Sequence, residues 1–383
     1  MIKKIFCLSI FLMMMSSSFL AADTIKIGLM GPMAGIWANT GKEMKLVVDL
    51  LAEDFNSKGG VLGKKIEIVA VNDEATPQGA VLAARELVGQ TVTAVIGSVT
   101  SSATEASQDI FHSARIIQIT NASTAIGLTE KNFKYFFRTC PRDDEQSRVI
   151  VQTIEKMKLK KIAILHDNTA TYAIGLADEV RIRAQQKNMD IVFNGSLTAG
   201  QTDYTDILKK IKMMNPDLVF FAGYCQETAQ LLRQKRELGW NVVFLGGDGA
   251  NDPNLVSIAG KKAAEGFYFS SPPLPGELTT ETAIKFLAEF KQKYGSSPQL
   301  IDSILAGDAF RVIVYTIRET KSSDPDVIAD YLHSRFVDRT GLTGNINFNA
   351  KGDRLNDLYG IYRVDAEGRF VMQRMFQHGQ IVK

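Results

Sequence analysis

Short β-branched runs alternate with longer amphipathic stretches along most of the chain, and this alternation constrains the fold most strongly. In the first part the predicted strands are 25–30, 66–71, 93–96, 115–119 and 133–138. The predicted helices between them include 40–57 and 77–90, the second with a proline in its first turn. Strands that alternate with helices form a parallel sheet wrapped in helices. The sequence therefore predicts an α/β fold.

The same alternation starts again near residue 160. The predicted strands of this second block are 161–166, 191–195, 218–223, 242–246 and 266–270, and its helices are 172–187, 204–214 and 227–238. A chain of 383 residues is longer than a single hydrophobic core usually supports, so two similar lobes are expected.

A proline-rich linker at 271–276 ends the second block. Predicted helices follow at 281–294, 301–320 and 326–336, and the last segments, 345–348, 358–364 and 369–375, alternate as strands do. We expect the late helices to pack back on the first lobe. The chain would then cross between the lobes several times and form a hinge.

The first 22 residues are typical of an export signal. Lys3 and Lys4 precede an apolar run at 5–15, and small residues lead to an expected cut after Ala22. The run is about half the ~20 residues that span a bilayer, so a soluble, exported protein is expected. Lys and Arg number 44 against 42 Asp and Glu, and removal of the leader makes the counts equal. A neutral chain without a basic run argues against nucleic acid or a membrane surface as partner.

Two segments rich in Ser, Thr and small residues, 97–105 and 119–125, directly follow predicted strands. The first leads into a helical pattern, where free backbone N–H groups favour an anion. We interpret the two turns as a clamp for the carboxylate of a small amino acid. Ser101 and Thr124 are the central residues of this clamp, although each could equally be a plain helix cap.

In the second block, two aromatic residues and one acid also follow strand ends: Tyr172, Tyr224 and Asp248. Ligands of open α/β sheets bind beyond the carboxyl ends of the strands. Hydroxyls in one lobe and a carboxylate with phenol rings in the other suit a zwitterion with an apolar side chain. The alternatives are half-buried packing for the tyrosines and a turn role for Asp248.

Signatures of enzymes, cofactors and metals are weak. The sequence has no nucleophile elbow, phosphate loop, His-Glu-x-x-His or Cys-x-x-Cys motif. A triad can be composed only from His166, Asp167 and Ser101, so an exported hydrolase is a minor alternative to a binding protein. No catalytic residue, cofactor or metal site is expected. Cys140 and Cys225 could pair after export or remain two buried thiols.

Several segments together resemble the periplasmic branched-chain amino-acid-binding proteins of the Leu/Ile/Val type, which serve ABC importers. The segments are 25–28 with 31–35, 56–63, 95–97 followed by 101–104, 166–172, 223–224 and 231–234. Their order and spacing carry the resemblance, which extends from about residue 23 to residue 360.

The resemblance implies the type I periplasmic binding fold, with two Rossmann-like lobes and parallel sheets joined by a three-stranded hinge. The implied lobes are 23–142 with 272–355, and 143–271 with 356–383. It also implies a periplasmic monomer that captures an apolar L-amino acid and presents it to an inner-membrane ABC permease. An aromatic amino acid, a small amide or urea is the alternative ligand.

By the position of the motifs, the resemblance also assigns the site. It implies that Ser101, Ala122 and Thr124 contact the carboxylate and ammonium groups of the ligand, and that Asp248 is the acidic partner of the ammonium. The side-chain pocket falls on Val99, Thr100, Ser123, Tyr172 and Tyr224.

This sequence departs from the family pattern at several positions. Thr40 and Gly307 stand where the family has aromatic residues, and these smaller residues imply a roomier pocket. Trp37, which is close to Thr40 in the sequence, could substitute for the first of the two missing aromatic residues. Ala75 and Thr100 replace the two cysteines of the family's small disulfide.

Overall fold

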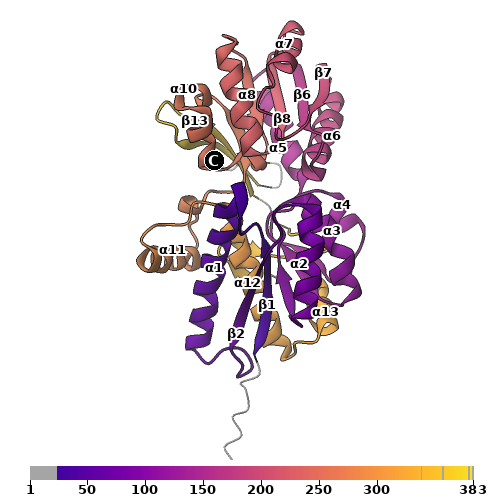
Figure 1. Cartoon of the computed structure of the whole chain (residues 1–383), viewed down its shortest axis with the longest axis vertical. Coiled ribbons are helices and arrows are strands. Elements are labelled where there is room, and N and C mark those ends of the chain that lie inside the picture. The colour runs from indigo at the N-terminus through magenta and orange to yellow at the C-terminus, as the bar shows by residue number, and fades with distance from the viewer. Residues whose placement is uncertain (1–23, 338, 356–357, 378–379, 382–383) are drawn as a thin grey trace, which may run out of the picture.

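The computed structural model describes residues 24–337, 339–355, 358–377 and 380–381. The predicted leader and its cut after Ala22 lie outside the described residues. Two α/β lobes stand one above the other, and the chain runs repeatedly between them (Figure 1). The predicted architecture of two Rossmann-like α/β lobes is confirmed.

The first lobe is built on a five-stranded parallel sheet in the order β2-β1-β3-β4-β5. Its strands are β1 (Ile25–Gly31), β2 (Ile66–Asn72), β3 (Ala94–Ile96), β4 (Ile117–Thr120) and β5 (Phe136–Arg138). Its early helices are α1 (Ala38–Ser57), α2 (Pro77–Gly89), α3 (Ser101–Ser113) and α4 (Gly127–Glu130). The late helices α11 (Glu281–Tyr294), α12 (Ile301–Thr320) and α13 (Pro325–Ser334) join the same lobe, as expected.

These helices cover both faces of the first sheet. Apolar residues of α1, α11, α12 and α13 share one core with one face, while α2 and α3 pack on the other. Figure 1 shows α1 beside α12, and α2 beside α3. Local sequence fixes several helix starts: the Thr76 hydroxyl accepts from Gly79 N–H, and Asp324 likewise caps α13.

The second lobe contains an eight-stranded sheet in the order β15-β14-β13-β10-β9-β8-β6-β7. Its first five strands are β6 (Lys161–Asp167), β7 (Asp190–Leu197), β8 (Leu218–Ala222), β9 (Val243–Gly246) and β10 (Tyr268–Ser271). Their order, β7-β6-β8-β9-β10, repeats that of the first sheet, and they are all parallel. The helices are α5 (Asp143–Lys156), α6 (Thr171–Gln186), α7 (Thr205–Met213), α8 (Cys225–Glu237), α9 (Asn254–Ala259) and α10 (Lys261–Ala264).

Three late strands make this second sheet mixed. β13 (Leu358–Val364), β14 (Phe370–Gln377) and β15 (Gln380–Ile381) add to β10 in antiparallel fashion. A short hairpin of β11 (Arg339–Gly341) and β12 (Gly344–Ile346) precedes them. The chain therefore passes between the two sheets after β5, after β10 and after β12, which gives the hinge its three segments.

Helix α5 is the longest element that the sequence patterns did not predict. It begins with three acidic residues, Asp143, Asp144 and Glu145, which mask the apolar periodicity of the sequence. Its apolar face includes Val149, Ile150 and Ile154. This face is buried in the second lobe.

In the described part of the chain, no helix combines the length and the apolar character needed to cross a bilayer. Cys140 and Cys225 are buried in the cores of different lobes and are not bonded to each other. This arrangement answers the open question of their pairing.

Candidate functional site

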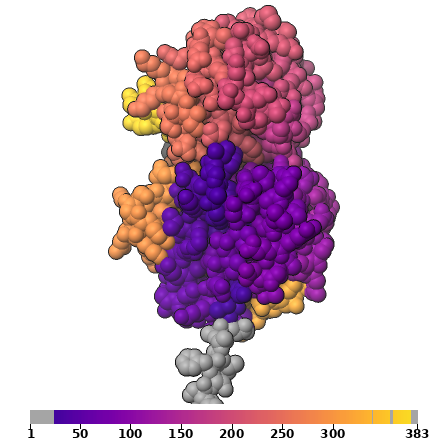
Figure 2. Space-filling view, viewed as in Figure 1, coloured from indigo at the N-terminus to yellow at the C-terminus, as the bar shows by residue number. Residues whose placement is uncertain are grey.

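A cavity lies between the lobes, where the carboxyl ends of both sheets face each other. Its lining consists of Trp37, Thr40, Val99, Ser101, Ala122, Thr124, Tyr172, Tyr224, Asp248, Gly249, Asn251, Asp252, Leu300, Ile301 and Asp302. The space between these residues that protein atoms leave empty is about 590 Å³, part of it open to solvent. The cavity's mixture of aromatic and aliphatic surface with a few polar groups is typical of a site for a small molecule. The space-filling view shows the two lobes meeting at a narrower level, where an indigo part of the lower lobe reaches the upper lobe (Figure 2).

The strand order explains why the cavity lies here. In the first sheet the order reverses between β1 and β3, so the loops after these strands diverge and leave a crevice. Trp37 follows β1, and Val99 and Ser101 follow β3. In the second sheet the same reversal separates β6 from β8, which are followed by Tyr172 and Tyr224.

In the first lobe, the start of α3 presents a hydroxyl to the cavity. Thr100 is the N-cap, and its side chain accepts a hydrogen bond from Ala103 N–H. Ser101 is therefore the first residue of the helix rather than its cap, and its hydroxyl accepts from the backbone N–H of Ala125 at 3.3 Å. This contact joins the two Ser/Thr-rich turns that the sequence analysis paired.

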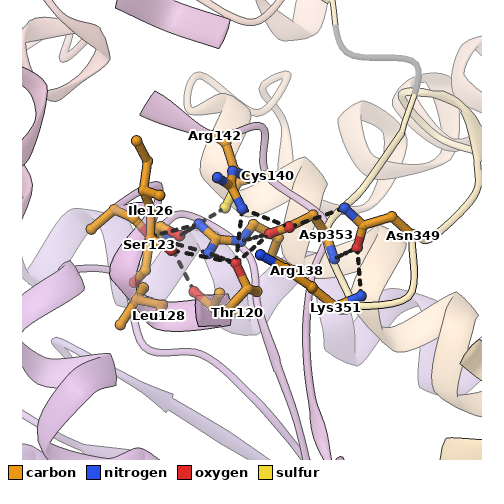
Figure 3. Close-up of polar contacts among 12 residues, drawn as sticks. Thr120, Ser123, Ile126, Leu128, Arg138, Cys140, Arg142, Asn349, Lys351 and Asp353 are labelled. Carbon is orange, nitrogen blue, oxygen red and sulfur yellow. Dashed lines mark hydrogen bonds and ion pairs between the residues drawn. The ribbon is translucent and has the colours of Figure 1, made fainter. Parts of the chain in front are cut away.

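The loop after β4 is held by Arg138, which is fully buried (Figure 3). Its guanidinium donates to the carbonyl oxygens of Ser123 and Ala125, at 3.0 and 3.1 Å from Nη1. Its Nε lies 2.9 Å from Oδ1 of Asp353, whose other oxygen is 2.8 Å from Nη1 of Arg142. Arg138, which lies where the chain enters the hinge, thus holds the backbone on either side of Thr124 in place. Sequence reasoning missed Arg138, because nothing local signals that an arginine at a strand end turns inward.

In the second lobe, Asp248 begins a short 3-10 turn, Asp248–Ala250. The Tyr172 hydroxyl accepts a hydrogen bond from Gly249 N–H at 3.1 Å, which fixes this turn against α6. The rings of Tyr172 and Tyr224 are 5.5 Å apart, and Trp37 of the first lobe meets Tyr224 edge-on at 5.0 Å. Aromatic surface from both lobes therefore encloses one end of the cavity.

The cavity is electrostatically negative. Burial raises the pKa of Asp248, and hydrogen bonds from Gln146 and Tyr172 only partly oppose that effect. Asp143, at the start of α5, is fully buried next to it, and burial followed by repulsion from Asp248 raises its pKa well above the ordinary value. The pKa of Asp302 is raised to about 7 by burial and by nearby carboxylates. A cation placed here would relieve all three effects.

Eight of the ten residues expected at the site line the cavity: Trp37, Val99, Ser101, Ala122, Thr124, Tyr172, Tyr224 and Asp248. Thr100 and Ser123 do not. The Thr100 hydroxyl donates to the carbonyl oxygen of Ala75 at 3.1 Å, at the two positions where the resemblance had placed a disulfide. The Ser123 hydroxyl is fully buried and lies within 2.7 Å of Thr104 Oγ1. Both hydroxyls are used inside the first lobe.

Residues at the start of α12 were not expected in the cavity. Leu300, Ile301 and Asp302 line it, and they come from a segment about 200 residues beyond the first-lobe turns. Gly307, which was expected at the pocket, lies instead in the core, where an added Cβ would be 2.8 Å from Leu342 Cδ1 and 2.9 Å from Val47 Cγ1. The expectation that Gly307 enlarges the pocket is therefore wrong: this glycine lets α12 approach α1.

The alternative hydrolase triad is not assembled. Ser101 lines the cavity, but His166 and Asp167 are absent from the lining among the described residues. The Asp167 carboxylate accepts from the N–H and hydroxyl of Thr169, at 2.9 and 2.7 Å. Within the described part of the chain, no group of His, Cys, Asp and Glu has an arrangement that could hold a metal ion.

The two lobes also touch directly at the starts of α3 and α6. The Ser102 hydroxyl accepts from the Thr171 backbone N–H at 3.0 Å and lies 3.2 Å from the Thr171 hydroxyl. The Thr171 hydroxyl also donates to Glu105 at 3.1 Å. Together with the contact between Trp37 and Tyr224, these bonds hold the lobes in a closed arrangement.

Comparison with known proteins agrees with this geometry. The family described as "Periplasmic binding protein" matches residues 24–369. The chain belongs to this family. The periplasmic binding proteins bind substrates for transport, and the coarse expectation of a binding protein rather than an enzyme agrees with that membership.

Two curated relatives of this periplasmic binding protein align over nearly their whole length. A Leu/Ile/Val/Thr/Ala-binding protein of Pseudomonas aeruginosa is 32% identical, with 91% of each chain covered. The Leu/Ile/Val-binding protein of Escherichia coli is 31% identical, with 92% of this chain and 94% of the relative covered. The resemblance seen in the sequence is confirmed.

Solved structures of similar proteins share the fold. A leucine-binding protein of Thermotoga maritima has a TM-score of 0.86 at 26% identity, with 93% of this chain and 99% of the other covered. A branched-chain amino-acid transporter substrate-binding protein of Streptococcus pneumoniae, solved with isoleucine, has a TM-score of 0.83 at 28% identity, with the same coverage.

Proposed function

We propose that this periplasmic binding protein captures an apolar L-amino acid between its lobes, with leucine, isoleucine and valine as first candidates. The observation that carries the proposal is the composition of the cavity: Ser101 and Thr124 on the first lobe, at and near the start of α3, line it together with Asp248 and two phenol rings on the second. A zwitterion places one charge on each side. The ligands named for the two curated relatives support the same choice.

In the proposed complex, Ser101 and Thr124 hold the ligand's carboxylate beside the start of α3, where unpaired backbone N–H groups favour an anion. Asp248 accepts from the ammonium, which relieves its repulsion with Asp143. Tyr172, Tyr224, Val99 and Trp37 cover the side chain, and Ala122 lets the ligand approach the loop.

Capture takes place by hinge closure, because the ligand contacts both lobes only when they meet. The two bodies that we propose are 23–142 with 272–355, and 143–271 with 356–383. This division follows the membership of the strands in the two sheets. The closed form, as a monomer, would dock on an inner-membrane ABC permease after export and removal of residues 1–22.

The proposal is tested by thermal shift and calorimetry of the mature protein with L-leucine, L-isoleucine and L-valine. A ligand that binds only the native state raises the melting temperature. D-Leucine is the matched control, because it has the same groups in the wrong order around Cα. Phenylalanine, acetamide and urea represent the alternative ligands. A rise with acetamide or urea but not with any L-amino acid would contradict the proposal, since those molecules carry no ammonium for Asp248.

A further inference from the structure

Asp302 is a third carboxylate in the cavity, and the amino-acid scheme above leaves it without a role. It reaches the cavity from the second position of α12, on the wall formed by the start of α12 with Trp37 and Thr40. Asp248 reaches the same cavity from the other lobe. Asp302 is half-buried, and it lines the cavity together with Leu300 and Ile301, which are buried and apolar.

The segment that leads into α12 is held by another acid, Glu43, and not by Asp302. Acidic side chains often serve the free N–H groups in the first turn of a helix. Glu43 instead holds the segment just before α12: it accepts from the N–H groups of Gln299 and Leu300 at 2.9 and 2.8 Å, and from the Ser303 hydroxyl at 2.7 Å. Burial and neighbouring carboxylates alone shift the pKa of Asp302, with no bond from a first-turn N–H group, so Asp302 is not the cap of α12.

The backbone of Asp302 is fixed in place by the loop that binds the ligand. The Asn121 side chain donates to the carbonyl oxygen of Asp302 at 2.9 Å, and Ala122 and Thr124 of the same loop line the cavity. Asp302 is thus held at a set distance from the proposed carboxylate clamp. A fixed, half-buried acceptor in a binding cavity is the arrangement that recognises a donor.

The charges in the cavity lead to the same conclusion. Asp248, Asp252 and Asp302 line it, and none of the lining side chains in the described part of the chain is positively charged. A zwitterionic ligand with an aliphatic side chain brings one ammonium and one carboxylate, so closure over it leaves Asp302 buried without a donor. A buried polar group left unpaired costs free energy.

We propose that Asp302 accepts a hydrogen bond from the ligand's side chain, so that among amino acids of equal size the cavity selects the one that carries a hydroxyl or amino donor. This inference rests on the proposed function, because it requires that an amino acid occupies the cavity. It adds a specificity that the aliphatic scheme lacks.

L-Threonine and L-valine form the decisive ligand pair, because they differ only by a hydroxyl in place of a methyl group. Calorimetry of the wild-type protein should give threonine about tenfold tighter binding than valine, which is the size of one well-formed hydrogen bond. L-Serine and L-2-aminobutyrate are a second pair with the same difference, and serine should bind more tightly.

The protein variant for this test is Asp302→Leu, which keeps the approximate size and removes the acceptor. Valine should then bind more tightly than threonine, so the ratio of the two dissociation constants should change by at least tenfold. Asp206→Leu is the matched control, since that carboxylate is fully exposed on α7, and it should leave the ratio unchanged. Circular dichroism melting shows that each variant is folded, and Asp302→Asn, which retains one acceptor oxygen, should give an intermediate ratio.

Two results would overturn the inference. If the wild-type protein binds valine more tightly than threonine, the cavity does not select a side-chain donor. If the ratio of the two dissociation constants is the same in the wild type and in both Asp302 variants, another residue is responsible for the selectivity. Both results leave amino-acid binding itself intact. If folded wild-type protein binds no amino acid at all, the proposed function fails as well, so the two failures are distinguishable.

Discussion

Arg138 and Asp353 form a fully buried ion pair that joins two of the three segments between the lobes (Figure 3). Arg138 ends β5, and Asp353 precedes β13, more than 200 residues later in the sequence. The same guanidinium also holds the loop that contains Thr124. A single contact therefore fixes both the hinge and one wall of the binding cavity.

Asp353→Asn should lower the free energy of unfolding by about 3–5 kcal/mol, because Arg138 would keep a fully buried charge without its counterion, whereas Arg142 still pairs with Asp144. Urea unfolding measures the change. Asp178→Asn is the matched control: it breaks an exposed pair with Arg181, where a loss below about 1 kcal/mol is expected. Equal losses in the two variants would show that burial of the hinge pair has no energetic consequence.

The same pair predicts a loss of stability in acid. Although burial acts in the opposite direction, Arg138 and Arg142 hold the pKa of Asp353 below its ordinary value. Its stabilising contribution is present above the unfolded pKa of about 4 and is lost as the pH falls through the lower folded pKa. The melting temperature of the wild type should fall over this window by more than that of Asp353→Asn.

Asp248→Ala should weaken amino-acid binding at least tenfold, because it leaves the ammonium unpaired in a closed cavity. The unliganded variant should melt no lower than the wild type at pH 7, because the substitution removes a carboxylate that burial and Asp143 destabilise. Calorimetry and thermal melting measure the two effects. Affinity that stays within twofold of the wild type would rule out Asp248 as the partner of the ammonium.

Ser102→Ala should reduce affinity by about two- to tenfold, because it removes the bonds to Thr171 that form only when the lobes meet. The loss should appear as faster ligand dissociation in stopped-flow measurements. Ser113→Ala, at the exposed end of the same helix, is the control. Identical dissociation rates for the two variants would show that the contact between α3 and α6 does not hold the closed form.

Asp302 should make the unliganded protein less stable as the pH rises. Its pKa is raised to about 7, first by burial and then by Asp248, Asp252 and Glu43, which face it from neighbouring segments. A group with a raised folded pKa stabilises the fold below its unfolded pKa of about 4 and loses that effect as the pH rises to about 7. Asp302→Asn should therefore flatten the decline of the melting temperature between pH 4 and pH 7. A decline as steep as in the wild type would contradict this prediction.

The sequence predicted most of the strands and helices, because buried strands and amphipathic helices leave strong local patterns. It also predicted most of the cavity, because residues at the carboxyl ends of parallel strands meet at one edge of a sheet. The failures have different physical causes. Ser123 lies between two cavity residues, but its hydroxyl turns into the core. Asp302 and Arg138 depend on contacts between distant segments, for which a single sequence has no local signal.

The Thr100 hydroxyl donates to the carbonyl oxygen of Ala75, and no reductant can break this hydrogen bond between the two segments. Cys140 and Cys225 are far from each other, each inside its own lobe. Oxidising folding catalysts are thus irrelevant to the maturation of the binding loops. The protein should reach the same active form in a reducing cytoplasm, or in buffers that contain dithiothreitol, as in an oxidising compartment.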